Sequence, residues 1–155
     1  MPDGLSALAM PAPKKAKTAA RSSAAVEDYL ERILELINTK GYARVVDIAE
    51  SLKISQASVT NMVQRLDGEG LLKYEKYRGL ALTASGEALA KNITRRHKIL
   101  TDFFRLFALD EETIYHDVEG MEHHISPPTL KVIEALTTQL ERQSALVARV
   151  RAEIK

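Results

Sequence analysis

The sequence predicts a mainly α-helical chain made of two small lobes. Apolar residues recur at helical spacing through most of the chain after residue 25, and only residues 71–82 favour strands. Aromatic residues make up 5% of the chain, and long side chains of high helix propensity dominate. A chain of 155 residues has room for one small module and a second small domain that shares surface with it.

The composition excludes several kinds of site. The chain has no cysteine, which rules out disulfides, thiolate metal sites and cysteine nucleophiles, so any metal must be held by oxygen and nitrogen. No apolar run approaches the roughly 20 residues that span a bilayer, and the N-terminus lacks the apolar core of a secretion signal. We therefore expect a cytoplasmic protein with no membrane partner.

The first 24 residues differ from the rest in charge. Their Lys and Arg residues give them a formal charge of about +3, which leaves about −2 for the remainder of a chain whose total is +1. Pro, Ala, Ser and Lys in this segment cannot bury enough apolar surface to offset the entropy of ordering it. We expect residues 1–24 to form a disordered basic leader that either keeps the chain in solution or attracts nucleic acid.

The first predicted helix covers residues 26–37 and ends before Gly41, which tolerates the positive φ of a helix end. Asp28 and Glu31 lie three residues apart on this helix, so both carboxylates project from one side. By themselves they are most simply a solvated face paired with nearby cations, Arg32 or Lys40.

Two short helices follow, over residues 45–52 and 56–66, with Ser55 as the N-cap of the second. Two short helices joined by a tight turn predict a helix-turn-helix unit. The second helix has an apolar stripe on one side. Its other side is uncharged and rich in amides, and comprises Gln56, Ala57, Thr60, Asn61 and Gln64.

A two-stranded ribbon completes this unit. Residues 71–75 and 80–82 flank a turn at residues 76–79 and have the pattern of paired strands. A ribbon that directly follows a helix-turn-helix unit is the wing of a winged helix. The sequence therefore predicts a winged helix-turn-helix domain over residues 25–84.

The long helix that comes next is predicted to begin at Thr83, which acts as its cap, and to end near Leu109. Its last part is strongly apolar and contains three phenylalanines. So much exposed apolar length in a small protein requires a partner surface. We expect part of a dimer interface at Phe103, Phe104 and Phe107.

The last predicted helix starts at Ser126, which is an N-cap followed by two prolines in the first turn. Apolar residues at helical spacing indicate that it continues through Val147. This helix is the other candidate for the dimer interface. Residues 85–155 are therefore predicted to form an all-helical domain for dimerisation.

An acidic segment lies between these two helices. Residues 110–122 hold six carboxylates and no Lys or Arg, a concentration that is unfavourable unless a cation offsets it. On a helix, Glu119, Glu122 and His123 converge on one face, and two hard oxygens with an imidazole suit a divalent first-row metal. The alternative for this segment is an exposed acidic face.

The remaining histidines divide into two kinds. His97 lies near the apolar edge of its helix and is, considered singly, a half-buried histidine. We expect His116 and His124 to lie at the surface or to contact ligand residues, without being metal ligands themselves. The joint pattern is more specific, because four carboxylates and two imidazoles occupy three predicted helices around one winged helix.

This pattern comes with a set of sequence motifs, of which the last is highly diagnostic: Val26–Glu31, Lys40–Val45, Asp47–Glu50, Tyr74–Leu80, Arg96-His97 and Asp117–His124. With these motifs the chain resembles the DtxR/MntR family of metal-dependent transcriptional repressors, and closely its manganese transport regulator branch. The resemblance covers roughly residues 25–140.

The resemblance implies a manganese site with two Mn²⁺ per monomer, whose ligands are Asp28, Glu31, His97, Glu119, Glu122 and His123. In the iron-responsive branch the positions of Asp28 and Glu119 typically hold methionine and cysteine. Carboxylates at both positions favour Mn²⁺, because thioether and thiolate suit softer metals. Spacing alone does not choose between two ions and one ion with bound waters.

The resemblance also implies a homodimer that represses manganese uptake genes and binds operator DNA when Mn²⁺ is bound, without an organic cofactor. We expect the amide-rich helix face to read bases in the major groove through Gln56, Thr60, Asn61 and Gln64. Cations around the wing are expected to bind phosphates, namely Arg44, Lys73, Lys76 and Arg78.

Three alternatives stay open at this point. One is an iron-responsive regulator of the same family. A second is a metal-dependent hydrolase, because carboxylate-bridged metals also activate water, although the sequence supplies no substrate pocket or general base beyond the ligands. The third is a metal-independent regulator whose acidic helix binds a partner protein. We favour a regulator that is not an enzyme.

Overall fold

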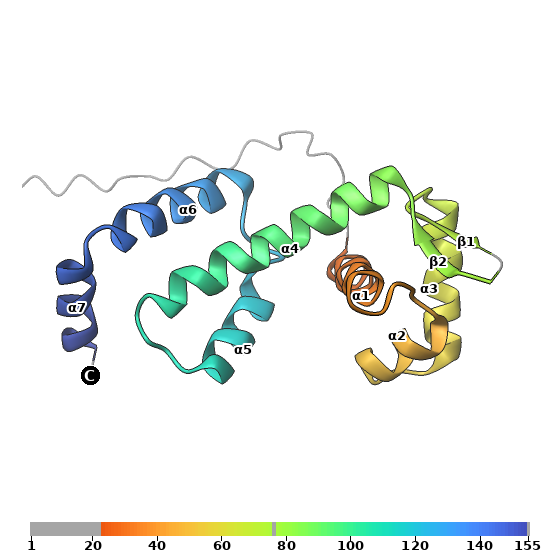
Figure 1. The fold of residues 1–155 in the computed structure, drawn as a ribbon, viewed down its shortest axis with the longest axis horizontal. Helices are drawn as coiled ribbons and strands as arrows, with labels where there is room; N and C mark the ends of the chain where they lie inside the picture. The colour runs from red at the N-terminus through yellow and green to blue at the C-terminus, as the bar shows by residue number, and fades with distance from the viewer. Residues whose placement is uncertain (1–22, 76, 155) are drawn as a thin grey trace, which may run out of the picture.

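The computed structural model describes residues 23–75 and 77–154. Within them the chain is mainly helical, with one small ribbon of two strands (Figure 1). None of the described helices is both long and apolar enough to cross a membrane. The elements, in order, are α1 Ala24–Lys40, α2 Val45–Leu52, α3 Gln56–Gly68, β1 Leu72–Glu75, β2 Gly79–Leu82, α4 Ala84–Arg105, α5 Glu111–Met121, α6 Pro127–Glu141 and α7 Ser144–Glu153.

Side-chain caps set the starts of most helices. An oxygen of each cap accepts a hydrogen bond from the backbone N–H three residues further on, which satisfies one of the amides left free in the first turn. Ser55, Thr83 and Ser126 do this for α3, α4 and α6, as the sequence predicts. Gly41 ends α1 with a φ of 81°, which also confirms the prediction.

Three helices and the ribbon form the first lobe. The strands pair antiparallel, with Leu72 opposite Leu82 and Glu75 opposite Gly79. The Leu80 amide also donates to the Ala43 carbonyl at 2.9 Å, which ties the ribbon to the loop after α1. The lobe has one apolar core, built mainly from Leu30, Ile33, Ile48, Val59, Leu66, Leu72 and Ile93. The predicted winged helix-turn-helix is therefore present.

Helix α4 is the element that both lobes share. Its first half packs on α1 and β2, and its second half packs on α5 and α6. Figure 1 shows it crossing the centre of the molecule, with the winged helix at one end and α5 to α7 at the other. A second, smaller core forms there around Leu100, Ile114 and Val118. Residues from α1, α4 and α5 meet where the two cores adjoin.

The prediction of one last helix through Val147 is wrong. The chain leaves the helical conformation at Gln143, whose φ and ψ are −122° and 61°, and α7 begins at the next residue. After this break the Arg151 guanidinium donates to the Leu106 carbonyl at the end of α4, at 2.7 Å. No glycine or proline marks the break, so only the packing of α7 against the rest of the lobe reveals it.

The apolar end of α4 is less exposed than the sequence predicts. Phe103 lies edge-on to both Phe104 and Phe107, with ring centroids 5.4 Å apart in each pair, and all three are half-buried. The clearly exposed apolar pair lies on α6, where Val132 and Leu136 are 65% and 46% exposed. The rings are partly covered because they pack on one another, and Phe104 also packs against the smaller core.

The close approach of α4 to the ribbon depends on Gly86. A Cβ at this position would lie 1.8 Å from the Leu71 carbonyl oxygen. Although alanine has the higher helix propensity by about 1 kcal/mol, we predict that Gly86→Ala lowers the free energy of unfolding by about 1–3 kcal/mol. Thermal denaturation measures this.

The matched control is Gly68→Ala, because a Cβ there meets no described atom within 4 Å. We expect this variant to be as stable as the parent chain or slightly more stable. An equal gain of stability in both variants would show that α4 does not require glycine where it touches the ribbon.

Candidate metal centre

The six candidate ligands come from three elements of the junction. Helix α1 carries Asp28 and Glu31 on one side, and α4 carries His97. Glu119 lies in the last turn of α5, Glu122 is the C-cap residue, and His123 follows it in the turn. The structure brings all six predicted residues into one neighbourhood, although they span 96 positions of the sequence.

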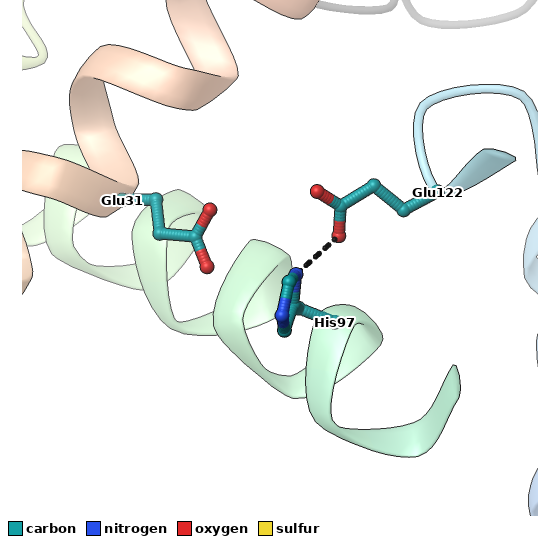
Figure 2. A group of neighbouring side chains, drawn as sticks. All are labelled: Glu31, His97 and Glu122. Carbon is teal, nitrogen blue, oxygen red and sulfur yellow. Dashed lines mark ion pairs between the residues drawn. The ribbon is translucent and has the colours of Figure 1, made fainter. Parts of the chain in front are cut away.

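One part of the cluster surrounds His97. Each of Glu31, His97 and Glu122 offers a ligand atom, and these atoms lie within 4.8 Å of one another. His97 Nδ1 is 3.3 Å from Glu122 Oε2 and 3.6 Å from Glu119 Oε1. Figure 2 shows the Glu31 and Glu122 carboxylates pointing toward the imidazole ring. Three hard oxygen donors and a ring nitrogen thus face one small volume.

The other part of the cluster surrounds His123. Its Nε2 lies 3.2 Å from Asp28 Oδ1 and 3.9 Å from Glu122 Oε1. Glu122 therefore faces His97 with one carboxylate oxygen and His123 with the other. A carboxylate in this position can bridge two cations or hold one cation between the two histidines.

Glu122 is fully buried, and neither of its oxygens has a hydrogen-bond partner among the described residues. The same is true of His97 Nδ1, whose 3.3 Å approach to Glu122 lacks hydrogen-bond geometry. An ionised carboxylate buried without partners is strongly unfavourable. A bound divalent cation would satisfy these atoms, so the residues present fit a metal.

The electrostatics of the cluster also favour a bound cation. Burial raises the pKa of Asp28, Glu31 and Glu119, and the neighbouring Glu122 carboxylate raises each of them further. The close contact with Glu122 also raises the pKa of His97. Each carboxylate is thus destabilised in its charged form by the other carboxylates, and a cation would relieve that repulsion.

The cations that the sequence offered to Asp28 and Glu31 pair elsewhere. Arg32 pairs with Glu35, and Lys40 donates to Asp47 at 2.9 Å. The simple interpretation of Asp28 and Glu31 as a face paired with these two residues is therefore wrong.

The acidic segment before the cluster has a structural role. Asp110 caps α5, and Glu111 pairs with Arg105 at 2.7 Å. The Thr113 amide and the Arg105 guanidinium hold the pKa of these two carboxyls below their usual range. Only the end of the segment, at Glu119 and Glu122, belongs to the cluster.

Sequence reasoning missed one residue. Glu27 is a buried carboxylate that accepts hydrogen bonds from Arg96 and lies 2.7 Å from His123 Nδ1. The signal was present, because Glu27 occupies the same helical stripe as the core residues Leu30 and Leu34. An acidic residue on a core stripe requires a buried partner.

The residues predicted to contact DNA lie on one lobe. Gln56, Thr60, Asn61 and Gln64 are all exposed along α3, although the Thr60 hydroxyl donates to the Gln56 carbonyl at 2.9 Å. Arg44, Lys73 and Arg78 are exposed around the ribbon, and Lys76 lies outside the described residues. The predicted surface residues His116 and His124 are exposed too.

Two family models match this chain in succession. The model described as "Iron dependent repressor, N-terminal DNA binding domain" matches residues 22–80. The model described as "Iron dependent repressor, metal binding and dimerisation domain" matches residues 83–144. The first match covers the winged helix, and the second begins at the cap of α4 and ends at the start of α7.

Two curated relatives of this chain have the same name. The HTH-type transcriptional regulator MntR of Lysinibacillus sphaericus is 50% identical over 127 residues, which are 82% of this chain and 91% of the relative. The protein of the same name from Bacillus subtilis is 50% identical over 120 residues, which are 77% of this chain and 84% of the relative.

Solved structures share the fold. The manganese regulator SloR matches 73% of this chain with a TM-score of 0.65 and 28% identity, and IdeR of T. acidophilum matches 69% with a TM-score of 0.62 and 28% identity. This chain spans about half the length of these two structures, at 53% and 51%. From the two family models and the curated relatives, the chain belongs to the iron-dependent repressor family of metal-binding transcriptional regulators, in its MntR branch.

Proposed function

We propose that this chain is a manganese-responsive repressor that binds operator DNA as a homodimer when Mn²⁺ is bound, and that it controls manganese uptake genes. The observation that carries the proposal is the buried Glu122 carboxylate, which lies between two histidines at the junction of the lobes and has no hydrogen-bond partner among the described residues. The family consists of transcriptional regulators, so the chain is a regulator and not a hydrolase.

The proposed ligands are Asp28, Glu31, His97, Glu119, Glu122 and His123. Two Mn²⁺ per monomer are supported by the two oxygens of Glu122, which face different histidines. Four carboxylates and two imidazoles, without sulfur, suit Mn²⁺ better than a softer metal. SloR, which shares the fold, is named a manganese regulator. An iron-responsive regulator is the second candidate, because both family models are described as iron dependent repressors.

The proposed switch follows from where the ligands lie. Asp28 and Glu31 belong to α1 of the winged helix, whereas Glu119, Glu122 and His123 belong to the other lobe. Repulsion among the carboxylates loosens this junction in the metal-free chain. Bound Mn²⁺ neutralises the repulsion, and the residues then hold the lobes in the arrangement that fits DNA. Metal can change the populations of the loose and the DNA-binding arrangements only as far as its affinities for the two differ.

The proposed domain limits are 25–84 for the DNA-binding part and 85–155 for the part that dimerises and binds metal. The exposed face of α3 would enter the major groove with Gln56, Thr60, Asn61 and Gln64. Arg44, Lys73, Lys76 and Arg78 would contact phosphates and set the orientation of the protein on the duplex. A two-fold dimer places two such helices about 34 Å apart, one helical turn of DNA.

DNA binding as a function of metal tests this proposal. A duplex is first selected from genomic fragments by binding in the presence of Mn²⁺, without selection for metal dependence, and its affinity is then measured by fluorescence anisotropy with Mn²⁺, Fe²⁺, Zn²⁺ or a chelator. We predict that chelation lowers the affinity at least tenfold and that Glu119→Ala has the same effect in the presence of Mn²⁺. The ligand carboxylate is required because its loss leaves the site with fewer charges and donors.

Affinity that depends on neither metal nor Glu119 would contradict the proposal and favour the metal-independent regulator. A response to Fe²⁺ at a free concentration where Mn²⁺ has no effect would favour the iron-responsive regulator.

Burial of Glu119 and its repulsion by Glu122 predict a gain of stability when the Glu119 side chain is made neutral. Because its pKa is raised above the value in the unfolded chain, ionised Glu119 destabilises the folded chain at neutral pH, and this cost is absent only at acidic pH. We predict that Glu119→Gln raises the Tm of the metal-free protein and reduces the further rise produced by Mn²⁺. Differential scanning calorimetry with and without Mn²⁺ measures both.

The control for this pair of measurements is Glu112→Gln, an exposed carboxylate of the same helix. It removes the same charge away from the cluster and should leave the Mn²⁺-dependent rise unchanged. If Glu119→Gln instead lowers the Tm of the metal-free protein, the carboxylates do not repel one another as inferred.

The dimer is proposed to form through α6 and the apolar end of α4. Val132 and Leu136 lie one turn apart on α6 and form its exposed apolar pair. We predict that Val132→Glu with Leu136→Glu raises the dimer dissociation constant about tenfold or more, because apolar contacts at the centre of an interface dominate its energy. Analytical ultracentrifugation measures this. Lys131→Glu makes the same change of net charge on the same helix and should leave the dimer intact.

A further inference from the structure

Glu27 forms a buried polar link among three elements. It lies on α1 next to the candidate ligand Asp28 but faces the interior, where it is 7% exposed. Its Oε2 accepts from the Arg96 guanidinium of α4 and lies 2.7 Å from Nδ1 of His123, which follows α5. The link therefore joins α1, α4 and the end of α5 next to the carboxylate cluster.

The two ring nitrogens of His123 have different surroundings. Nδ1 faces Glu27, whereas Nε2 faces Asp28 at 3.2 Å and Glu122 at 3.9 Å. A neutral imidazole has one N–H and one lone pair, and the hydrogen bond made by one nitrogen determines which atom is free to bind metal. A neutral His123 that donates its N–H from Nδ1 to Glu27 would direct the lone pair of Nε2 into the cluster.

Arg96 holds Glu27 for this role. The guanidinium side chain is largely buried and donates to the same oxygen that faces His123. A guanidinium at this place fixes the position of the Glu27 carboxylate through a charge-assisted hydrogen bond.

We propose that Glu27 is a positioning residue for metal binding, which acts through His123 and is itself held by Arg96. This inference rests on the proposed function, because it requires His123 to bind metal. A carboxylate behind a ligating histidine fixes the ring and increases the basicity of the ligand, and loss of such a partner weakens metal binding by about 10–100-fold. Glu27 is not proposed as a ligand, since its oxygen is engaged by Arg96 and His123.

The test compares metal affinity in full-length variants. Glu27→Gln keeps the size of the side chain but replaces the ionised acceptor with a neutral amide. We expect it to weaken Mn²⁺ binding by about 10–100-fold, measured by competition with a fluorescent chelator, while the number of ions bound at saturation stays the same. The matched control is Glu134→Gln, which removes the exposed carboxylate that pairs with Arg95, the neighbour of Arg96. This control should bind Mn²⁺ like the parent chain.

A second measurement separates positioning from loss of folding. In protein labelled with ¹⁵N-histidine and loaded with diamagnetic Zn²⁺, NMR reports the proton on Nδ1 of His123, identified by its loss in His123→Gln. In the parent chain we expect this proton to be shifted downfield and to exchange slowly with water, because Glu27 accepts it. In Glu27→Gln it should move upfield and exchange faster, and in Glu134→Gln it should be unchanged.

The outcomes are distinguishable. If the parent chain does not bind Mn²⁺, the proposed function fails. If the parent chain binds Mn²⁺ and Glu27→Gln binds it equally well, or the Nδ1 proton is unchanged, the proposed function stands and the role of Glu27 is wrong. Loss of one whole ion in Glu27→Gln, with the other bound at parental affinity, would also overturn the inference, because Glu27 would then be a ligand.

Discussion

The arrangement of this molecule around its junction depends on one buried carboxylate. Glu122 ends α5 with no exposed surface, and its two oxygens face His97 and His123 without forming a hydrogen bond to either. A charge buried in this way is unfavourable unless a cation accompanies it. The neighbouring carboxylates share that cost, because burial and mutual repulsion raise their pKa values. A divalent cation at this junction would relieve both the cost of burial and the mutual repulsion of the carboxylates.

The helices around Glu122 connect this buried carboxylate to both lobes. Helix α4 belongs to both cores, and α1 packs along its first half. The link from Arg96 through Glu27 to His123 crosses the same junction and pairs buried charges without metal. The junction thus has a hydrogen-bonded polar link and, beside it, Glu122 oxygens and a His97 nitrogen with no hydrogen-bond partner among the described residues. The first can preserve the shape of the site while the second responds to metal.

Much of the fold was predictable because its signals are local. Caps at Ser55, Thr83 and Ser126 and the glycine after α1 follow from short-range hydrogen bonds and backbone conformation. The break between α6 and α7 was not predictable, since the apolar period continues across it and no breaker residue marks it. Glu27 was missed for the opposite reason. Its sequence neighbours mark it as part of a core stripe, but its partners Arg96 and His123 lie 69 and 96 positions away.

By itself, the sequence determined the winged helix and the absence of thiolate ligands, because these follow from residue type and spacing, and its motifs implied the six candidate ligands through the family resemblance. Tertiary structure alone decided how those six residues are shared around Glu122, which cations are engaged elsewhere and which apolar pair α6 exposes. The physical reason is that spacing places a side chain on a face of its own helix. Burial, charge repulsion and ligand geometry arise only when three helices distant in sequence pack against one another.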